Sequence, residues 1–337
     1  MNEQQKISKE LFQPAQIDLN KSERIEKPSL TYWEDAWIRF RKNKAAIVGI
    51  FLLAIVILLS LFGPMFSEYG MDDQDLSRAK LPPKIPILEN VSFLSVDGKD
   101  EKGIDIYEAK GIDSYFWFGT DGLGRDLWTR TWEGTRVSLF IAIVAAVIDM
   151  VVGVAYGGIS AYYGGRVDNI MQRIVEVLIG IPNLIIVILM ILVLKPGLTS
   201  IIIALTVTGW IGMSRMVRGQ VLRLKGHEFV LAAKTLGSSD SRVLSKHLIP
   251  NVAGIIIINT MFTIPSAIFF EAFLSFIGLG LQAPLASLGV LIEDGTKSLQ
   301  IFPHLMIFPA LVISILMIAF NLVADGLRDA LDPKMRD

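Results

Sequence analysis

Residues 228–251 read EFVLAAKTLGSSDSRVLSKHLIPN and lie between two long apolar stretches of the chain. The segment holds two short runs with apolar residues at helical spacing, joined at Gly237 and closed by Pro250. Glycine readily takes the left-handed conformation that ends a helix, and proline interrupts helices because it lacks a backbone N–H. The sequence therefore predicts a helix, a corner and a second helix, which together form a polar knob between two membrane-spanning segments.

Each half of this knob carries an apolar stripe at helical spacing. The first stripe consists of Phe229, Ala232, Ala233 and Leu236, and the second of Val243, Leu244, His247 and Leu248. Between them, residues 238–240 (SSD) offer side chains that cap a new helix. Such a knob either packs beneath its own bundle or docks into a soluble partner. The small side chains of Ala232 and Ala233 and the surrounding positive charge favour docking.

Apolar windows of membrane-spanning length surround the knob. The chain has 337 residues, of which 52% are hydrophobic, and crossing ~30 Å of hydrocarbon takes about 20 helical residues. Windows with at most one charged residue are 45–67, 137–160, 177–194, 196–214, 247–270, 272–292 and 298–324. Because residues 272–281 continue the preceding span and are glycine-rich, we treat the window 272–292 as an extension at its outer end. The sequence therefore predicts an all-α membrane protein with six spanning helices.

The distribution of lysine and arginine orients these helices, since cytoplasmic loops are enriched in both residues. The run RFRKNK at 39–44 crowds the start of the first span and places the N-terminus in the cytoplasm. Alternating from there, the knob at 228–251 and the C-terminal tail are cytoplasmic as well. The two short outer loops hold only Lys195 and Lys297 among the basic residues. Both termini are thus predicted to lie inside the cell.

The N-terminal part divides into two segments. Residues 1–30 are polar and lack periodicity, so they are predicted to be a mobile cytoplasmic tail. Residues 31–66 hold the first span, preceded by the aromatic run YWEDAWIRF at 32–40. That run suits an amphipathic helix in the inner membrane interface, and a simple helical extension of the span fits equally well.

The next segments are a loop and the main transmembrane part. Residues 67–118 form an extracellular loop between the first two helices, and its alternating runs at 91–96 and 104–107 suggest a small β-hairpin. Residues 119–337 complete the transmembrane core. We expect its first residues, GTDGLGRD, to form a turn that caps the second span through Asp126.

Two acidic residues are candidates for a transport pathway. Asp149 lies near the middle of the second span, where an acid costs ~2.5–3.5 kcal/mol on insertion scales. Its side chain should therefore face the bundle or water, either as a pathway group or as an internal hydrogen-bond partner. Glu271 lies near the outer mouth of the fifth span, where a gating or helix-end role and simple solvation both fit.

Other kinds of chemistry are not indicated. The chain has no cysteine, its three histidines do not form a metal-ligand pattern, and its net charge of −1 gives no field for nucleic acid. No GxxxxGK[ST] cradle for nucleotide phosphates occurs in the sequence. We expect no metal, cofactor or catalytic group in this chain, so active transport would need an energy source in another protein.

The knob resembles the cytoplasmic signature of ABC importer permeases, which reads E-A-A, three residues, G, nine residues, I-x-L-P. The signature aligns on residues 231–233, Gly237 and residues 247–250. Leu231 stands where the family has an acid, and Glu228, three residues upstream, is available for the polar contact instead.

Three further stretches resemble the C-type permease subunit of oligopeptide and dipeptide importers. They are GTDGLGRDLWTRTWEGTRVSL (119–139), YYGGRVDNIMQRIVEVLIGIP (162–182) and EAFLSFIGLGLQAP (271–284). The resemblance covers residues 31–334. One departure is Leu288, where that family usually has a tryptophan.

The resemblance implies a type I six-helix ABC importer permease bundle in the bacterial cell membrane. It also implies a homologous permease subunit as heterodimer partner, two cytoplasmic ABC ATPases that hold ATP and Mg, and an extracellular peptide-binding protein. The residues implied in ATPase contact are Glu228, Leu231, Ala232, Ala233, Gly237 and Pro250. This chain would be a non-catalytic subunit that forms half of a pathway for oligopeptides or dipeptides. Nickel or another small solute is the alternative cargo, and a stand-alone secondary transporter or channel is the alternative class.

Overall fold

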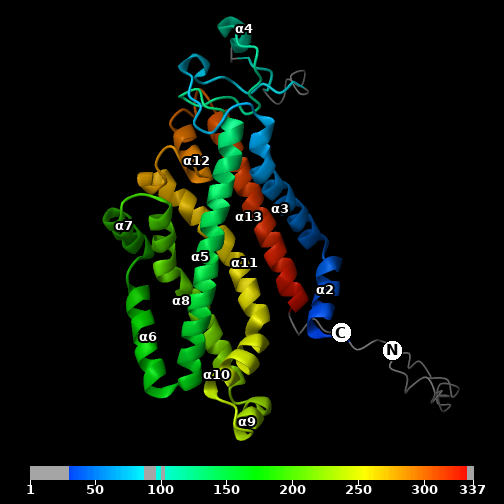
Figure 1. Cartoon of the computed structure of the whole chain (residues 1–337), viewed down its shortest axis with the longest axis vertical. Helices are drawn as coiled ribbons and strands as arrows, with labels where there is room; N and C mark the ends of the chain where they lie inside the picture. Colours follow the sequence, from blue (N-terminus) through cyan, green and yellow to red (C-terminus); the bar gives the residue numbers. More distant parts are fainter. Residues whose placement is uncertain (1–29, 87–95, 100–102, 332–337) are drawn as a thin grey trace, which may run out of the picture.

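The computed structural model describes residues 30–86, 96–99 and 103–331, which form an elongated bundle of helices (Figure 1). The tail predicted at 1–30 lies outside the described residues except for Leu30. The α-helices are α2 (Tyr32–Lys42), α3 (Lys44–Phe62), α4 (Ile106–Lys110), α5 (Leu127–Tyr163), α6 (Gly165–Gly180), α7 (Asn183–Leu194), α8 (Leu198–Leu224), α9 (Glu228–Thr235), α10 (Asp240–Arg242), α11 (Ile249–Leu274), α12 (Leu288–Thr296) and α13 (His304–Leu331). Two π-helical turns, Val243–Leu248 and Ser275–Leu279, precede and follow α11. Helix α4 lies at one end of the bundle and α9 at the other (Figure 1).

Six membrane spans are present if a bent helix pair is counted as one. Five helical segments of the described chain are long and apolar enough to cross a membrane, and α6 with α7 passes the same test as a pair. The third span, predicted as the single window 177–194, is wrong in detail because α6 and α7 are bent by 84°. Ile181 is extended, with φ −94° and ψ 125°, since the residue before a proline is disfavoured in the helical region. Pro182 therefore separates the two helices.

The fifth span also differs from the prediction. Pro250 does not close the second run of the knob, because the chain stays helical from Asp240 through Pro250 and on to Leu274 at the end of α11. Pro250 lies in the first turn of α11, directly after a π-helical turn, where its missing N–H is tolerated. The prediction that the window 272–292 does not form a separate span is confirmed. The helical backbone is broken at Gly278, whose φ angle is +82°, and the chain later forms the short helix α12.

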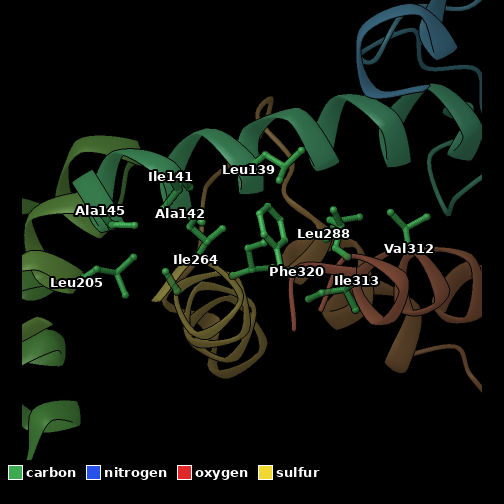
Figure 2. Close-up of a cluster of buried hydrophobic side chains, with 14 of the residues drawn as sticks. Leu139, Ile141, Ala142, Ala145, Leu205, Ile264, Leu288, Val312, Ile313 and Phe320 are labelled. Atoms are coloured by element: carbon green, nitrogen blue, oxygen red, sulfur yellow. The ribbon is translucent and has the colours of Figure 1, made fainter. Parts of the chain in front are cut away.

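The core of the bundle is formed around α5. A large cluster of buried apolar side chains joins α5 to α8, α11, α12 and α13 (Figure 2). Close approach to α8 depends on small residues, because a Cβ on Gly153 or Gly157 would overlap with Met213 or Ser214. Small residues at such contacts let helix backbones approach closely in a membrane. Helix α5 therefore fixes the position of the elements that carry the candidate sites.

A separate helix precedes the first span. Helix α2 begins at a capping box, in which Thr31 and Glu34 satisfy each other's backbone N–H groups. Asn43 is extended and caps the next helix by accepting a hydrogen bond from the Ala46 N–H. The chain therefore breaks between α2 and α3, and the alternative of a simple helical extension is wrong.

The segment between α3 and α5 does not contain the predicted hairpin in its described part. Tyr107 lies in the one-turn helix α4, and the described residues form only isolated β-bridges, such as that between Lys84 and Asp97. Most of the predicted strand at 91–96 lies outside the described residues. The cap on the second span is confirmed, because the Asp126 carboxylate accepts hydrogen bonds from the backbone N–H groups of Trp128 and Thr129. Burial raises the pKa of Asp126, and these hydrogen bonds act against that rise.

Candidate functional site

The knob at the α9 end has the predicted helix and corner. Helix α9 ends in a Schellman motif, in which the Ser238 N–H donates to the Ala233 carbonyl at 3.0 Å and the Gly237 N–H to the Lys234 carbonyl at 2.9 Å. The φ angle of Gly237 is +82°, which confirms the predicted left-handed corner. The next helix begins after Ser239, within the predicted capping segment, but no side chain makes a capping hydrogen bond there, so the predicted side-chain cap is wrong.

The knob both packs on its own bundle and presents an apolar surface. Val230 and Ala233 are buried in a cluster with residues of the π-helical turn and of α8. Phe229, Leu231 and Leu236 are exposed, Leu236 to 86%. The predicted stripe is therefore split, because Ala233 faces the bundle while Phe229 and Leu236 face away from it. The second stripe is confirmed as a packing face, since its buried members belong to the same cluster.

Tyr162, at the end of α5, holds the knob in place. Its hydroxyl donates to Asp240 Oδ1 at 2.5 Å, and Lys234 Nζ lies 4.7 Å from the centre of its ring. One aromatic side chain thus contacts both sides of the Gly237 corner. A cation over a tyrosine face is attracted by the ring quadrupole, so both contacts stabilise the same arrangement.

A second set of contacts fixes the adjoining corner between α5 and α6. Arg218 of α8 binds Asp168 of α6 through two hydrogen bonds, Nε to Oδ1 at 2.7 Å and Nη2 to Oδ2 at 2.6 Å. Ser160 donates to the same carboxylate at 2.5 Å, and Lys225 Nζ donates to the Ala161 carbonyl at 2.8 Å. A bidentate pair fixes both distance and orientation. These contacts join α5, α6 and α8 next to the knob and fix their relative positions.

The predicted contact residues fall into three groups. Helix α9 and its corner present an exposed set, which consists of Glu228, Leu231, Ala232 and Gly237. Ala233 is buried and supports the helix from below. Pro250 is exposed but lies beyond the π-helical turn, where it lines a cavity of about 920 Å³ between α2, α8, α11 and α13.

A second cavity, of about 360 Å³, lies next to Asp149 in the middle of α5. We call it the Asp149 cavity. Its polar lining consists of Asp149, Asn183, Asn259, Thr263 and Ser266. Asn259 and Phe262 line both this cavity and the larger one toward the α9 end, so the two adjoin along α11.

The two predicted pathway acids have different surroundings. Asp149 is buried, and its Oδ1 has no hydrogen-bond partner among the described residues. The alternative that Asp149 serves as an internal hydrogen-bond partner therefore does not explain the position of this oxygen. Glu271 is fully buried and accepts hydrogen bonds from Ser138 at 3.1 Å and Ser275 at 2.9 Å. The idea that solvation explains Glu271 is wrong, since water does not reach it.

Sequence reasoning missed the polar wall of α11. Asn259, Thr263 and Ser266 recur at i, i+4 and i+7 in α11, so they lie on one helix face. That spacing was the available signal. Tyr162 and Asp168 were also missed, because their partners on other helices lie far away in the sequence.

A bundle of membrane-spanning helices with a projecting knob and polar walls between its spans has the architecture of a membrane transport subunit. Family comparison makes the class specific. Residues 150–337 match the family described as binding-protein-dependent transport system inner membrane component. Residues 31–83 match the N-terminal TM domain of oligopeptide transport permease C. The chain belongs to the family of binding-protein-dependent transport system inner membrane components.

Several curated proteins are similar over nearly the whole length. The chain is 48% identical to the oligopeptide transport system permease protein OppC of Bacillus subtilis (strain 168), over 98% of this chain and 99% of that protein. It is 46% identical to the dipeptide transport system permease protein DppC of the same organism, over 98% and 94%. For OppC of Escherichia coli (strain K12) the identity is 38%, over 94% and 96%. Among solved structures, a chain of the inward-facing MetNI methionine ABC transporter matches with a TM-score of 0.48 and 19% identity, over 60% of this chain and 96% of that one.

Proposed function

We propose that this chain forms half of the translocation pathway of an ATP-driven importer of oligopeptides or dipeptides. The observation that carries the cargo assignment is the likeness over nearly the full length to permeases named for these peptides. The other half of the pathway would be a homologous permease subunit. Two ABC ATPases would bind ATP and Mg, and a separate binding protein would deliver the peptide. This chain would then carry no catalytic group.

The orientation is part of the same proposal. The basic residues at 39–44 support an orientation in which the α9 end and both termini would lie in the cytoplasm. The knob would then face the ATPases, and the segment between α3 and α5 would face the binding protein on the outside. An exposed apolar surface around Leu236 supports a docking role for the knob, since such a side chain is otherwise unfavourably placed in water.

A movement of the ATPases would displace the knob, and α11 would transmit this displacement to the translocation pathway. Tyr162 of α5 binds Asp240 of the knob, and Asp240 begins the helical segment that continues through α11. The polar wall of the Asp149 cavity lies on this same segment. A helix that is held at the knob and exposed to the cavity can transmit a displacement of one end to the other. The exposed residues Glu228, Leu231, Ala232 and Gly237 would make the ATPase contact, and Pro250 would lie behind it.

The test is reconstitution of the complete transporter in proteoliposomes with its ATPases and binding protein. We expect peptide-loaded binding protein to stimulate ATP hydrolysis and ATP-dependent peptide uptake. Stimulation by a nickel-loaded binding protein, without stimulation by peptides, would reassign the cargo. Ion-driven uptake by this chain without ATPases would contradict the class of transporter.

A variant at the corner tests the role of the knob. Gly237→Val should assemble but fail to transport, because a β-branched residue is strained at φ +82° although the space around the residue is open. Gly237→Asn should retain transport, since asparagine tolerates this conformation. Gly226→Val is the matched control, because Gly226 is in the same loop with open space and no positive φ. Normal uptake by Gly237→Val would contradict the proposal.

A further inference from the structure

The Asp149 cavity contains a buried acid without a compensating group. Asp149 is 6% exposed, and its Oδ1 has no hydrogen-bond partner among the described residues. The described residues that line the cavity include no lysine, arginine or histidine. An uncompensated carboxylate inside a membrane bundle is unfavourable, and such groups mark the paths of substrates and ions. The cavity is therefore built for a positively charged group.

The fold keeps the space beside this carboxylate open. Gly209 of α8 lies directly opposite, and a Cβ on it would overlap with the carboxylate of Asp149. A larger residue at this position would displace the acid or fill the cavity. The glycine thus allows the carboxylate to remain between α5 and α8 while it lines the cavity.

The other polar groups of the cavity suit an ammonium ion with a peptide bond attached. Thr263 and Ser266 donate their hydroxyl hydrogens to carbonyl groups of α11, at 3.0 and 2.9 Å. Their oxygen lone pairs remain available to accept hydrogen bonds from a ligand. Asn259 provides an amide that can pair with a backbone amide. One charged acceptor is thus surrounded by neutral groups that do not select a particular side chain.

We propose that Asp149 binds the protonated amino terminus of the peptide as it passes through the bundle. This inference rests on the proposed function. Every linear peptide with a free amino terminus carries an ammonium group whatever its sequence, so one carboxylate can hold all such cargo without reading side chains. The ammonium group of a lysine side chain has the same chemistry, and the experiment separates these two sources.

The first experiment measures peptide uptake and ATP hydrolysis by the complete transporter in proteoliposomes. A peptide without lysine or arginine is compared with its N-acetylated form and with an N-acetylated form that contains one lysine. The binding protein is kept saturated with each peptide, and its loading is measured separately. For Asp149→Asn we expect about a tenfold lower ratio of free-amine peptide imported to ATP hydrolysed, the size expected for one lost charge-assisted hydrogen bond. Uptake of the neutral acetylated peptide should be the same in both proteins.

Glu271→Gln is the matched control for this experiment. It also removes a buried carboxylate, but one that is already hydrogen-bonded to Ser138 and Ser275. This variant should change the uptake of free-amine and acetylated peptides by the same factor. A loss for the acetylated lysine peptide alone would assign the site to side chains and overturn the proposal. An equal effect of Asp149→Asn on all three peptides would overturn it as well.

A second measurement reports the direction of the bound peptide. The chain has no cysteine, so Thr263→Cys places a single thiol of this subunit in the Asp149 cavity. Peptides whose first or last residue is a cysteine held in a mixed disulfide with thiopyridine are offered during turnover. Attack of the thiolate at position 263 on the peptide sulfur releases thiopyridone, and the disulfide-linked products are identified by mass spectrometry. Cross-linking should favour the peptide with cysteine first, and Asp149→Asn should remove that preference. A preference for the last residue, or one that Asp149→Asn leaves unchanged, would contradict the proposal.

The proposed function and this inference fail in different ways. If the unmodified transporter shows no peptide-stimulated ATP hydrolysis, the cargo assignment fails. If it imports peptides and Asp149→Asn imports the free-amine peptide equally well, only the inference fails.

Discussion

Asp149 and Glu271 are both buried inside the membrane-spanning helices, and their surroundings are opposite. Glu271 accepts hydrogen bonds from Ser138 of α5 and Ser275 of the π-helical turn after α11, and it lines neither of the two cavities described above. Asp149 lies beside a cavity, and one of its oxygens has no partner in the described part of the chain. A buried acid with complete hydrogen bonding joins helices, whereas one without a partner at a cavity is available to a ligand. The contrast assigns a structural role to Glu271 and a binding role to Asp149.

Stability measurements separate these roles, and the chain offers a simple probe. Because the sequence lacks cysteine, Ala142→Cys introduces one buried thiol into the core of this subunit. Its reaction with a thiol reagent is followed against denaturant in the purified transporter, and labelling is measured on this chain after the subunits are separated by electrophoresis, so that it reports unfolding of this chain alone. Each variant below is compared in that background.

The largest effect is expected for Glu271→Ala. The change leaves the hydroxyl groups of Ser138 and Ser275 without their acceptor and opens a space in the core. Unsatisfied groups and a cavity together should lower the free energy of unfolding by about 3 kcal/mol. Asp149→Ala should not be destabilising, because it removes an acid that lacks a partner at Oδ1. Equal destabilisation by both variants would remove the distinction between the two sites.

The next effect concerns the residue opposite Asp149. Gly209→Ala should lower the free energy of unfolding by about 2 kcal/mol, since the new Cβ overlaps with the Asp149 carboxylate and overpacking costs about this much. Combining it with Asp149→Ala should restore most of the loss, because the overlapping atoms are then absent. The double-variant cycle measures this coupling. Additive losses would show that Gly209 acts on something other than the carboxylate.

The contrast between these acids also shows what the sequence could and could not predict. Five of the six predicted spans, the Gly237 corner and the Asp126 cap depend on residues close together in the chain, and the structure confirms them. The bend before Pro182 also has a local signal in the proline itself, but the continuous apolar window 177–194 predicts a straight helix.

Contacts between residues far apart in the chain have no local signal in the sequence and could not be predicted from it. Glu271 and Ser138 are 133 positions apart, so their pairing depends on how α5 and α11 pack. Which residues of α9 face outward could not be predicted from the sequence for the same reason. Its apolar spacing predicted a stripe, but only packing decides that Ala233 faces inward and Leu236 outward. The Asp149 cavity likewise requires four helices to come together.

A smaller effect is expected for Ser138→Ala, which weakens the shell of Glu271 without removing the acid. Ser138 donates to Glu271 and accepts a hydrogen bond from the backbone N–H of Leu288 at 3.2 Å, so it joins α5 to both α11 and α12. Alanine leaves that buried N–H unsatisfied and should lower the free energy of unfolding by about 1.5 kcal/mol. Combined with Glu271→Ala, the loss should be less than the sum of the two. Strict additivity would contradict a shared network.

The smallest effect, and the one with the opposite sign, is expected for Asp149→Asn. The amide is nearly the same size as the carboxylate, so packing against Gly209 is kept while the unfavourable charge is removed. The free energy of unfolding should rise by about 1 kcal/mol, because an unpaired buried charge costs more than the unpaired neutral amide that replaces it. Functional sites commonly hold groups that lower stability, and replacing them stabilises the protein at the expense of activity. A decrease in stability would mean that the carboxylate is held by a partner in the assembled transporter, and the difference between Asp149 and Glu271 would then be one of location alone.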